Sequence, residues 1–367
     1  MDFDLTEEQQ LLRDTTRELL SRSYDIERLN KVADTDLGWS REVWNQLAEV
    51  GILGLGFDPS ESGQIEIMVV ATEIGRRLAP EPVAHAALVP GALIAELGNE
   101  QQKQMLDDVA SGGTLLAFAH LEPGMRQPSD EIGSTAQRSD PWTITGRKNP
   151  VLAGDCADVV IVSAKLPGGG VGLFLVEGAS AQRRAYRTFD GQRGADIHLD
   201  STAAEPLGDG GDAGEHIVRA VIRYQSVLCA EAVGAMEEAL RLTTEYLTSR
   251  KQFGVTLSKF QTLTQRAADM YVSLELARSM NFYAAMSIAD GTFDPVIAAR
   301  AKLQIGRSGR HIAQEAIQLH GGIGMTAEYP VGHYAARLTA IGNTLGTTDD
   351  QLRTLIGRIG SYGAVAL

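Results

Sequence analysis

The sequence predicts an α+β protein that is mainly α, with an N-terminal helical domain, a middle β-barrel or sandwich domain and a C-terminal four-helix bundle. Three observations predict this fold class. Apolar residues recur at helical spacing up to about residue 109 and again after residue 214. Short β-rich runs separated by Gly and Pro lie between these regions, and a Gly/Asp-rich linker at 208–214 follows them. We therefore predict domains at 1–112, 113–207 and 208–367.

The first helix is predicted to begin after Thr6, where Thr-Glu-Glu-Gln is a capping-box pattern. In such a box the Thr6 hydroxyl accepts from the Gln9 amide, and the Gln9 side chain reaches back. Further apolar faces at helical spacing extend the helical region. They comprise Leu11, Leu12, Leu19 and Leu20; Trp44, Leu47, Val50 and Ile52; and the segments 68–77 and 101–109.

The middle region is predicted to be a barrel or sandwich because its β-rich runs are short and regularly spaced. The strand candidates are 114–120, 142–145, 158–164, 171–176 and 196–199. In the last region, residues 217–250 predict one long helix. A second helix is predicted after Gly254, a third from about Pro295 to His320, and shorter ones after Pro330.

The composition of the chain excludes several classes of protein. The chain has 33 basic and 47 acidic residues, a net charge of −14, which argues against a general nucleic-acid binder but leaves room for a local anion site. We find no apolar run of about 18 residues and no signal-peptide pattern at the acidic N-terminus, so we expect a cytoplasmic protein without membrane association. Cys156 and Cys229 are too few for a disulfide framework and are predicted to be small buried residues, and the histidines show no metal-ligand spacing.

Three segments of the last third form a recognisable series: Arg-Lys-Gln-Phe-Gly at 250–254 followed by Phe260-Gln261, Gln-Leu-His-Gly-Gly-Ile-Gly at 318–324, and Glu-Tyr-Pro at 328–330. Weaker matches lie at 97–101, 111–112, 122–124 and 146–148. In this order they resemble the acyl-CoA dehydrogenase family over nearly the whole chain. The resemblance implies the fold above, FAD as cofactor, and α,β-dehydrogenation of an acyl-CoA thioester in fatty acid or steroid side-chain β-oxidation.

The resemblance also implies roles for individual residues. In the family the residue at Arg250 pairs with the FAD pyrophosphate of a neighbouring subunit, and a guanidinium fork suits two phosphate oxygens. We predict that Phe253 packs against the adenosine end, that Gly321 and Gly322 let the backbone approach the cofactor without a Cβ, and that Gln318 lies beside them as an amide donor. Taken singly, a surface ion pair at Arg250 and a simple Gly turn are the plainer interpretations. The predicted cofactor-binding residues are Arg250, Phe253, Gln261, Gln318, Gly321 and Gly322.

The positions of the family's catalytic base are altered. Counting on from Glu-Tyr-Pro, the base position is Leu345, which cannot accept a proton. Some members place the base in the first helix of the C-terminal bundle, at a position that is Tyr224 here, and an unperturbed tyrosine with a pKa of about 10 is a poor base. Glu231 lies on roughly the same side of that helix and is a candidate displaced base; the alternative is a helix carboxylate that is paired with another chain or with solvent. Glu237 and Glu238 are predicted to lie on a solvated face.

Flavin-ring positions of the β-domain are altered as well. Pro150-Val151-Leu152 stands where the family has an aromatic residue, a branched residue and a hydroxyl residue, and Leu121 stands where it has Thr. Because the positions that reach a neighbour's FAD are retained, we predict a subunit that lends its pyrophosphate contacts to a homologous catalytic partner in a heterotetramer. Two alternatives stay open: a complete homo-oligomeric acyl-CoA dehydrogenase that uses Glu231, and a non-enzymatic acyl-CoA-binding or scaffold protein on this fold.

Two other motifs have plainer interpretations. Gly168-Gly169-Gly170 lacks the Lys and Ser/Thr that a phosphate loop requires, so we predict a strand turn. A basic cluster in the β-domain is predicted to be a solvated loop face, with a CoA phosphate as the alternative partner. It consists of Arg183, Arg184 and Arg187.

Overall fold

The structure is a computed structural model that describes residues 4–60 and 62–361. The chain divides into two compact units. One is formed mainly by Ala71–Leu78 and the chain from Gln225 onward, and the other by Leu5–Val70 and Ala79–Tyr224. The domain boundaries at 112 and 207 stay a prediction.

The N-terminal region is helical, as predicted. The capping box of the first helix is confirmed, since the Gln9 amide donates to Thr6 Oγ1 at 3.2 Å and the Thr6 amide donates to Gln9 Oε1 at 3.0 Å. Helices at 26–33 and 89–97 were not predicted, and a five-residue π-helical turn, Ala84–Leu88, precedes the second of them. The helices are α1 (Glu7–Ser23), α2 (Ile26–Ala33), α3 (Arg41–Glu49), α4 (Gln64–Arg77), α5 (Val89–Leu97), α6 (Glu100–Lys103) and α7 (Met105–Ala110).

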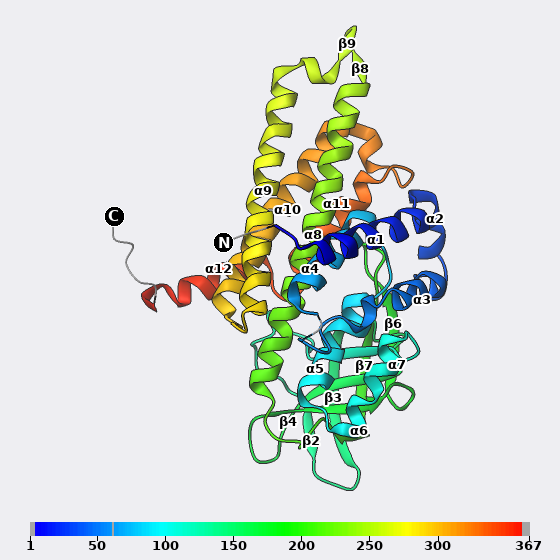
Figure 1. The fold of residues 1–367 in the computed structure, drawn as a ribbon. Helices are drawn as coiled ribbons and strands as arrows, with labels where there is room; N and C mark the ends of the chain where they lie inside the picture. Colours follow the sequence, from blue (N-terminus) through cyan, green and yellow to red (C-terminus); the bar gives the residue numbers. More distant parts are fainter. Residues whose placement is uncertain (1–3, 61, 362–367) are drawn as a thin grey trace. The chain divides into compact units, whose positions relative to one another are not determined.

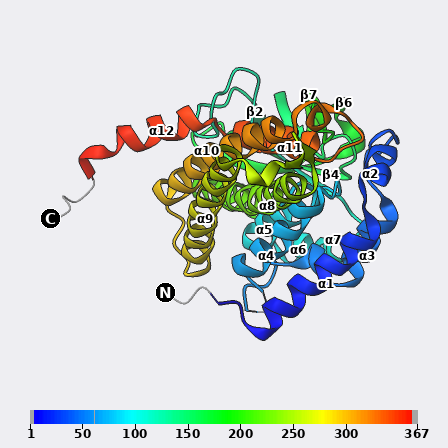
Figure 2. The same cartoon turned by 90° about the horizontal axis from the view of Figure 1, so that it is seen from above.

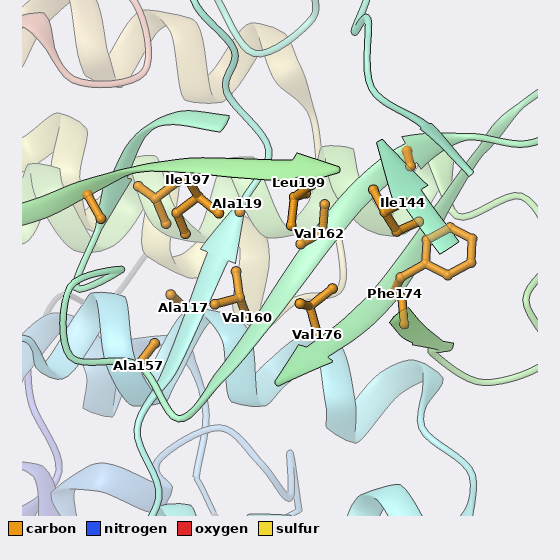
Figure 3. Close-up of a cluster of buried hydrophobic side chains, with 14 of the residues drawn as sticks. Ala117, Ala119, Ile144, Ala157, Val160, Val162, Phe174, Val176, Ile197 and Leu199 are labelled. Carbon is orange, nitrogen blue, oxygen red and sulfur yellow. The ribbon is translucent and has the colours of Figure 1, made fainter. Parts of the chain in front are cut away.

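The middle region forms a seven-stranded sheet that closes on itself. Its strands are β1 (Leu116–Ala119), β2 (Thr135–Gln137), β3 (Trp142–Leu152), β4 (Val159–Lys165), β5 (Val171–Glu177), β6 (Gln182–Arg187) and β7 (Arg193–Pro206). The pairings of β4 with β5, β5 with β7, β7 with β3, β3 with β2 and β2 with β4 complete a ring, so the sheet is a barrel. Figure 3 shows buried side chains such as Val160, Phe174 and Leu199 gathered between its strands.

All five predicted strands are present, and two strands were missed. Residues 135–137 and 182–187 lack an alternating apolar pattern, so neither resembled a strand in the sequence. The prediction of a loop for Arg183, Arg184 and Arg187 is therefore wrong, because these residues lie on β6. Among the strands that the structure describes, β6 pairs with β7 alone, and its charged side chains suit an edge strand.

The C-terminal region is a helical bundle, as predicted. Its elements are α8 (Gly214–Ser249), the short strands β8 (Lys251–Gln252) and β9 (Val255–Thr256), α9 (Gln261–Ala289), α10 (Pro295–His320), α11 (Val331–Asn343) and α12 (Thr348–Gly357). The helix α10 packs against α9, α11 and α12. Figures 1 and 2 show α9 and α10 running alongside the C-terminal part of α8, with the β8–β9 hairpin joining α8 to α9. The α+β, mainly α fold class is confirmed.

Candidate functional site

The residues predicted to reach a neighbour's cofactor all lie among the C-terminal helices. Arg250 directly follows α8 and is exposed, and within the described ranges no side chain pairs with its guanidinium group. Arg241 on the same helix differs, since its guanidinium donates to Glu238 at 2.8 Å and also bonds Glu245. The Arg250 guanidinium therefore keeps its hydrogen-bond donors available for an anion.

An exposed aromatic ring projects from the hairpin that follows Arg250. The loop between β8 and β9 consists of Phe253 and Gly254, with φ angles of 53° and 81°. Such a two-residue turn fixes the direction of both strands. The Phe253 side chain is 90% exposed, and its ring meets the ring of Phe260 edge-on, with centroids 6.2 Å apart. The Phe253 ring is therefore open to contact with another molecule.

A glycine turn lies at the end of α10. Gly321 has φ 65° and ψ −142°, a conformation open essentially to glycine alone. A Cβ at Gly321 or at Gly322 would have no heavy atom within 4 Å among the described residues, so the backbone there faces open space. Gln318 and Gln261, at the end of α10 and the start of α9, are both exposed. Ile323 and Met325 add exposed apolar surface beside the turn.

His320 connects the glycine turn to the end of α8. Its ring stacks on Tyr246, one helical turn before Arg250, with centroids 4.6 Å apart. Its Nδ1 lies 2.8 Å from the Ala316 carbonyl oxygen and its Nε2 lies 3.2 Å from the Tyr329 hydroxyl. Burial lowers the pKa of His320 and favours the neutral ring. These contacts make His320 a positioning residue that holds the glycine turn beside the last turn of α8.

Glu231 is fully paired within its own chain. Its two carboxylate oxygens accept from Arg337 Nε at 2.6 Å and Arg337 Nη2 at 2.7 Å, and both residues are buried. Protonation of the carboxylate would remove the negative charge on which this bidentate ion pair depends. The geometry therefore indicates a paired structural carboxylate, whose partner lies in the same chain and not in another chain or in solvent.

The prediction of a solvated face for Glu237 and Glu238 is wrong. Glu237 bonds Arg76 and accepts from Arg278 Nε at 2.7 Å, while Glu238 is 6% exposed. The reason is that Arg76 of α4 and Arg278 of α9 pair with Glu237 of α8, and the sequence around Glu237 indicates neither partner.

The two family positions for the base contain no carboxylate. Leu345 is buried with φ 58°, and its carbonyl oxygen accepts from Gln225 Nε2 at 3.3 Å and Gln351 Nε2 at 3.1 Å. The Tyr224 hydroxyl bonds His85 Nδ1, and both side chains are buried. Leu345 is thus held by its backbone and presents only an alkyl side chain.

A buried lysine fixes the strand that ends in Pro150-Val151-Leu152. Lys148 Nζ donates to Glu122 Oε1 at 2.7 Å, to Ser163 Oγ at 3.1 Å and to the His120 carbonyl oxygen at 3.2 Å. Burial lowers the pKa of Lys148 to about 8. Burial alone would raise the pKa of Glu122, but its bonds to Lys148 and to backbone amides hold that pKa at about 2. Sequence reasoning noted both residues in weak motifs but did not predict their pairing.

The chain matches family models at both ends. Residues 6–113 match the acyl-CoA dehydrogenase N-terminal domain and residues 220–360 match the acyl-CoA dehydrogenase C-terminal domain. A short-chain-specific acyl-CoA dehydrogenase of Clostridium acetobutylicum is 28% identical, with 98% of this chain and 100% of the relative covered. Acyl-CoA dehydrogenase IpdE2 of Mycobacterium tuberculosis is 29% identical, with 95% and 96% covered.

Solved structures show the same fold. A variant of the Tcur3481-Tcur3483 steroid ACAD is 29% identical with a TM-score of 0.89, covering 97% of this chain and 98% of that one. The ChsE4-ChsE5 complex from Mycobacterium tuberculosis includes a chain with a TM-score of 0.90 at 24% identity, covering 99% and 100%. Among the helices that the structure describes, none combines the length and apolar character needed to cross a bilayer.

Proposed function

Because this chain belongs to the acyl-CoA dehydrogenase family, we propose that it is one subunit of a heteromeric, FAD-dependent acyl-CoA dehydrogenase and lends cofactor contacts to a homologous catalytic partner. The observation that carries the proposal is a contrast. Arg250, Phe253 and the Gly321-Gly322 turn are exposed and free to meet a ligand, whereas Leu345 offers no proton acceptor.

We assign the exposed groups to the pyrophosphate and the adenosine end of FAD. The Arg250 guanidinium would pair with the pyrophosphate, and Phe253 would pack on the adenosine end. Gly321 and Gly322 would admit the cofactor close to the backbone, with Gln318 and Gln261 as amide partners at the rim. When bound, FAD accepts the hydride from the acyl-CoA substrate.

These cofactor-binding residues would bind or orient FAD, and none of them would move a proton. His320 supports this role indirectly because it holds the glycine turn against Tyr246. The proton next to the thioester carbonyl then needs a carboxylate from the partner subunit, since a carboxylate in a water-poor pocket is the usual base for this step.

The relatives support a heteromer and an acyl-CoA substrate. The Tcur3481-Tcur3483 enzyme is described as a steroid ACAD and is named for two gene products. We propose by this likeness that the acyl group is a steroid side chain and that the assembly is a heterotetramer. A cytoplasmic location is a separate part of the proposal.

The test is flavin content of the complex with its homologous partner. Arg250→Ala should lower the ratio of flavin to protein absorbance by about tenfold at limiting FAD, because a charge-assisted bidentate contact contributes roughly 1.5–3 kcal/mol. The matched control is Arg184→Ala, which removes an exposed arginine from β6 and should leave the ratio unchanged. Equal flavin content in the Arg250→Ala complex and the wild type would refute the lending role.

A further inference from the structure

The last helix of the bundle, α12, turns its apolar side toward solvent. The residues that it buries are polar, Asp350 and Gln351. Apolar residues recur at helical spacing along α12 and the short turn that follows it. They are Leu352, Leu355, Ile356 and Ile359. Ile356 is 57% exposed and Ile359 is 69% exposed. A surface helix of a globular protein ordinarily buries its apolar side, so the orientation of α12 is reversed.

The first turn of α12 anchors this helix to its own chain. Gln351 Nε2 donates to the Leu345 carbonyl oxygen at 3.1 Å. A Cβ at Gly306 of α10 would lie 2.7 Å from Thr348 Oγ1, so α10 and the start of α12 are in close contact. From this anchor α12 projects away from α9 and α10, as Figures 1 and 2 show. The apolar side of α12 therefore lies outside the bundle of its own chain.

A second apolar surface lies on α9, in the same compact unit as α12. On one side α9 buries residues such as Leu274 and Ala277, and it packs against α10. The other side, which we call the outer face of α9, carries Val272 and Leu276 one helical turn apart, with Tyr271 beside them. Each of these three side chains is more than half exposed. Apolar residues on both sides are typical of a helix that is covered on both sides.

The two apolar surfaces differ in charge. Residues 351–361 contain two arginines, Arg353 and Arg358, and no acidic residue. The chain as a whole has a net charge of −14, and the exposed Asp269 precedes Val272 by three positions, so it lies along the outer face of α9. Opposite charges across an interface steer association and fix its register. A second copy of this chain therefore offers α12 both an apolar contact and the opposite charge.

We infer that α12 of one copy of this chain docks on the outer face of α9 of a second copy. A two-fold axis makes the contact reciprocal, so each copy donates its α12 and receives that of the other. The small area that one ten-residue helix can cover is thereby supplied twice. The inference does not rest on the cofactor-lending role of Arg250, but a heterotetramer built from two pairs of unlike chains would contain the two copies that it requires.

The test is the mass in solution of the full-length chain expressed alone. We expect a dimer, and we expect Ile356→Glu combined with Ile359→Glu to raise its dissociation constant by more than about a hundredfold, because each dimer loses four buried isoleucines. Leu276→Glu should also weaken the dimer. The matched control is Leu11→Glu, which changes a leucine of α1 that is as exposed as Ile359 and should leave the dimer intact. Circular dichroism verifies that each variant is folded.

Cross-linking identifies the receiving surface. A mixture of Ile356→Cys and Leu276→Cys chains treated with a short bismaleimide should give a cross-linked dimer, whereas neither variant alone should, and the wild-type chain with its two native cysteines measures the background. A monomeric wild-type chain would overturn the inference, as would a dimer that persists in both glutamate variants. A cross-link in the Ile356→Cys chain alone would place α12 against α12 and refute docking on α9.

Discussion

Arg337 of α11 holds both carboxylate oxygens of Glu231 of α8, at 2.6 Å and 2.7 Å, in the interior of the C-terminal helices. Removing one partner of such a buried pair leaves an uncompensated charge and typically costs about 3–5 kcal/mol. We expect Glu231→Gln to lower the free energy of unfolding by roughly that amount and to leave turnover of the heteromeric enzyme unchanged below its melting temperature.

A double variant controls for this interpretation. Glu231→Leu combined with Arg337→Met removes both charges and should recover most of the lost stability, since apolar replacement of a buried pair is often neutral. Denaturant unfolding and steady-state turnover are the two measurements. A loss of turnover in Glu231→Gln without a loss of stability would favour Glu231 as a displaced base.

The stability of the chain should also be sensitive to substitutions where α4 and α8 cross. A Cβ at Gly234 would lie 1.8 Å from the Thr72 carbonyl oxygen, and a Cβ at Gly75 would lie 1.8 Å from the Glu231 carbonyl oxygen. We expect Gly234→Ala to destabilise the chain by more than about 3 kcal/mol or to prevent soluble expression, because the two backbones must move apart. Thermal unfolding measures the effect.

A glycine without such a neighbour is the matched control. Gly342 lies within α11, and a Cβ there would meet no described heavy atom within 4 Å. Gly342→Ala should be neutral or stabilising by up to about 1 kcal/mol, because alanine favours a helix. Equal destabilisation by the two substitutions would mean that the crossing is looser than described.

Glu81 gives the stability of the chain a pH dependence. Burial raises the pKa of Glu81 to about 7 from an ordinary 4.5. Because the folded-state pKa is the higher one, the stabilising contribution is fully present below about pH 4.5 and is lost as pH rises through 7. We expect Glu81→Gln to remove this dependence, on the order of 3 kcal/mol between pH 5 and pH 8.

Urea unfolding of the two proteins at both pH values measures the difference. Glu49→Gln, which changes an exposed carboxyl at the end of α3, is the control and should leave the dependence intact. If Glu81→Gln and the wild type lose stability in parallel between pH 5 and pH 8, Glu81 is ionised normally and the account of its burial is wrong.

Local patterns in the sequence predicted most of the helices and strands but few of the contacts between residues far apart in the chain. The Thr6 cap, the five strands and the long helices follow from periodicity and turn residues, which act over a few positions. The partner of Glu231 is 106 positions away, so nothing near Glu231 indicates it. β6 was missed because none of its residues is buried on either face, so its sequence carries no apolar alternation.

The candidate site was predicted because short motifs resemble those of a known family. The properties of the single residues would not have identified it. The sequence pointed to Arg250 and the Gly321 turn by resemblance, but not to the His320–Tyr246 stack that places them side by side. The roles of the cofactor-binding residues and the domain boundaries remain predictions.

The most direct test of the central claim compares the chain expressed alone with the chain co-expressed with a homologous family member. Visible absorption and mass in solution are the measurement. We predict a colourless protein alone and a yellow heteromer that reduces its flavin with an acyl-CoA. A yellow homo-oligomer of this chain that reduces its own flavin with an acyl-CoA would contradict the account.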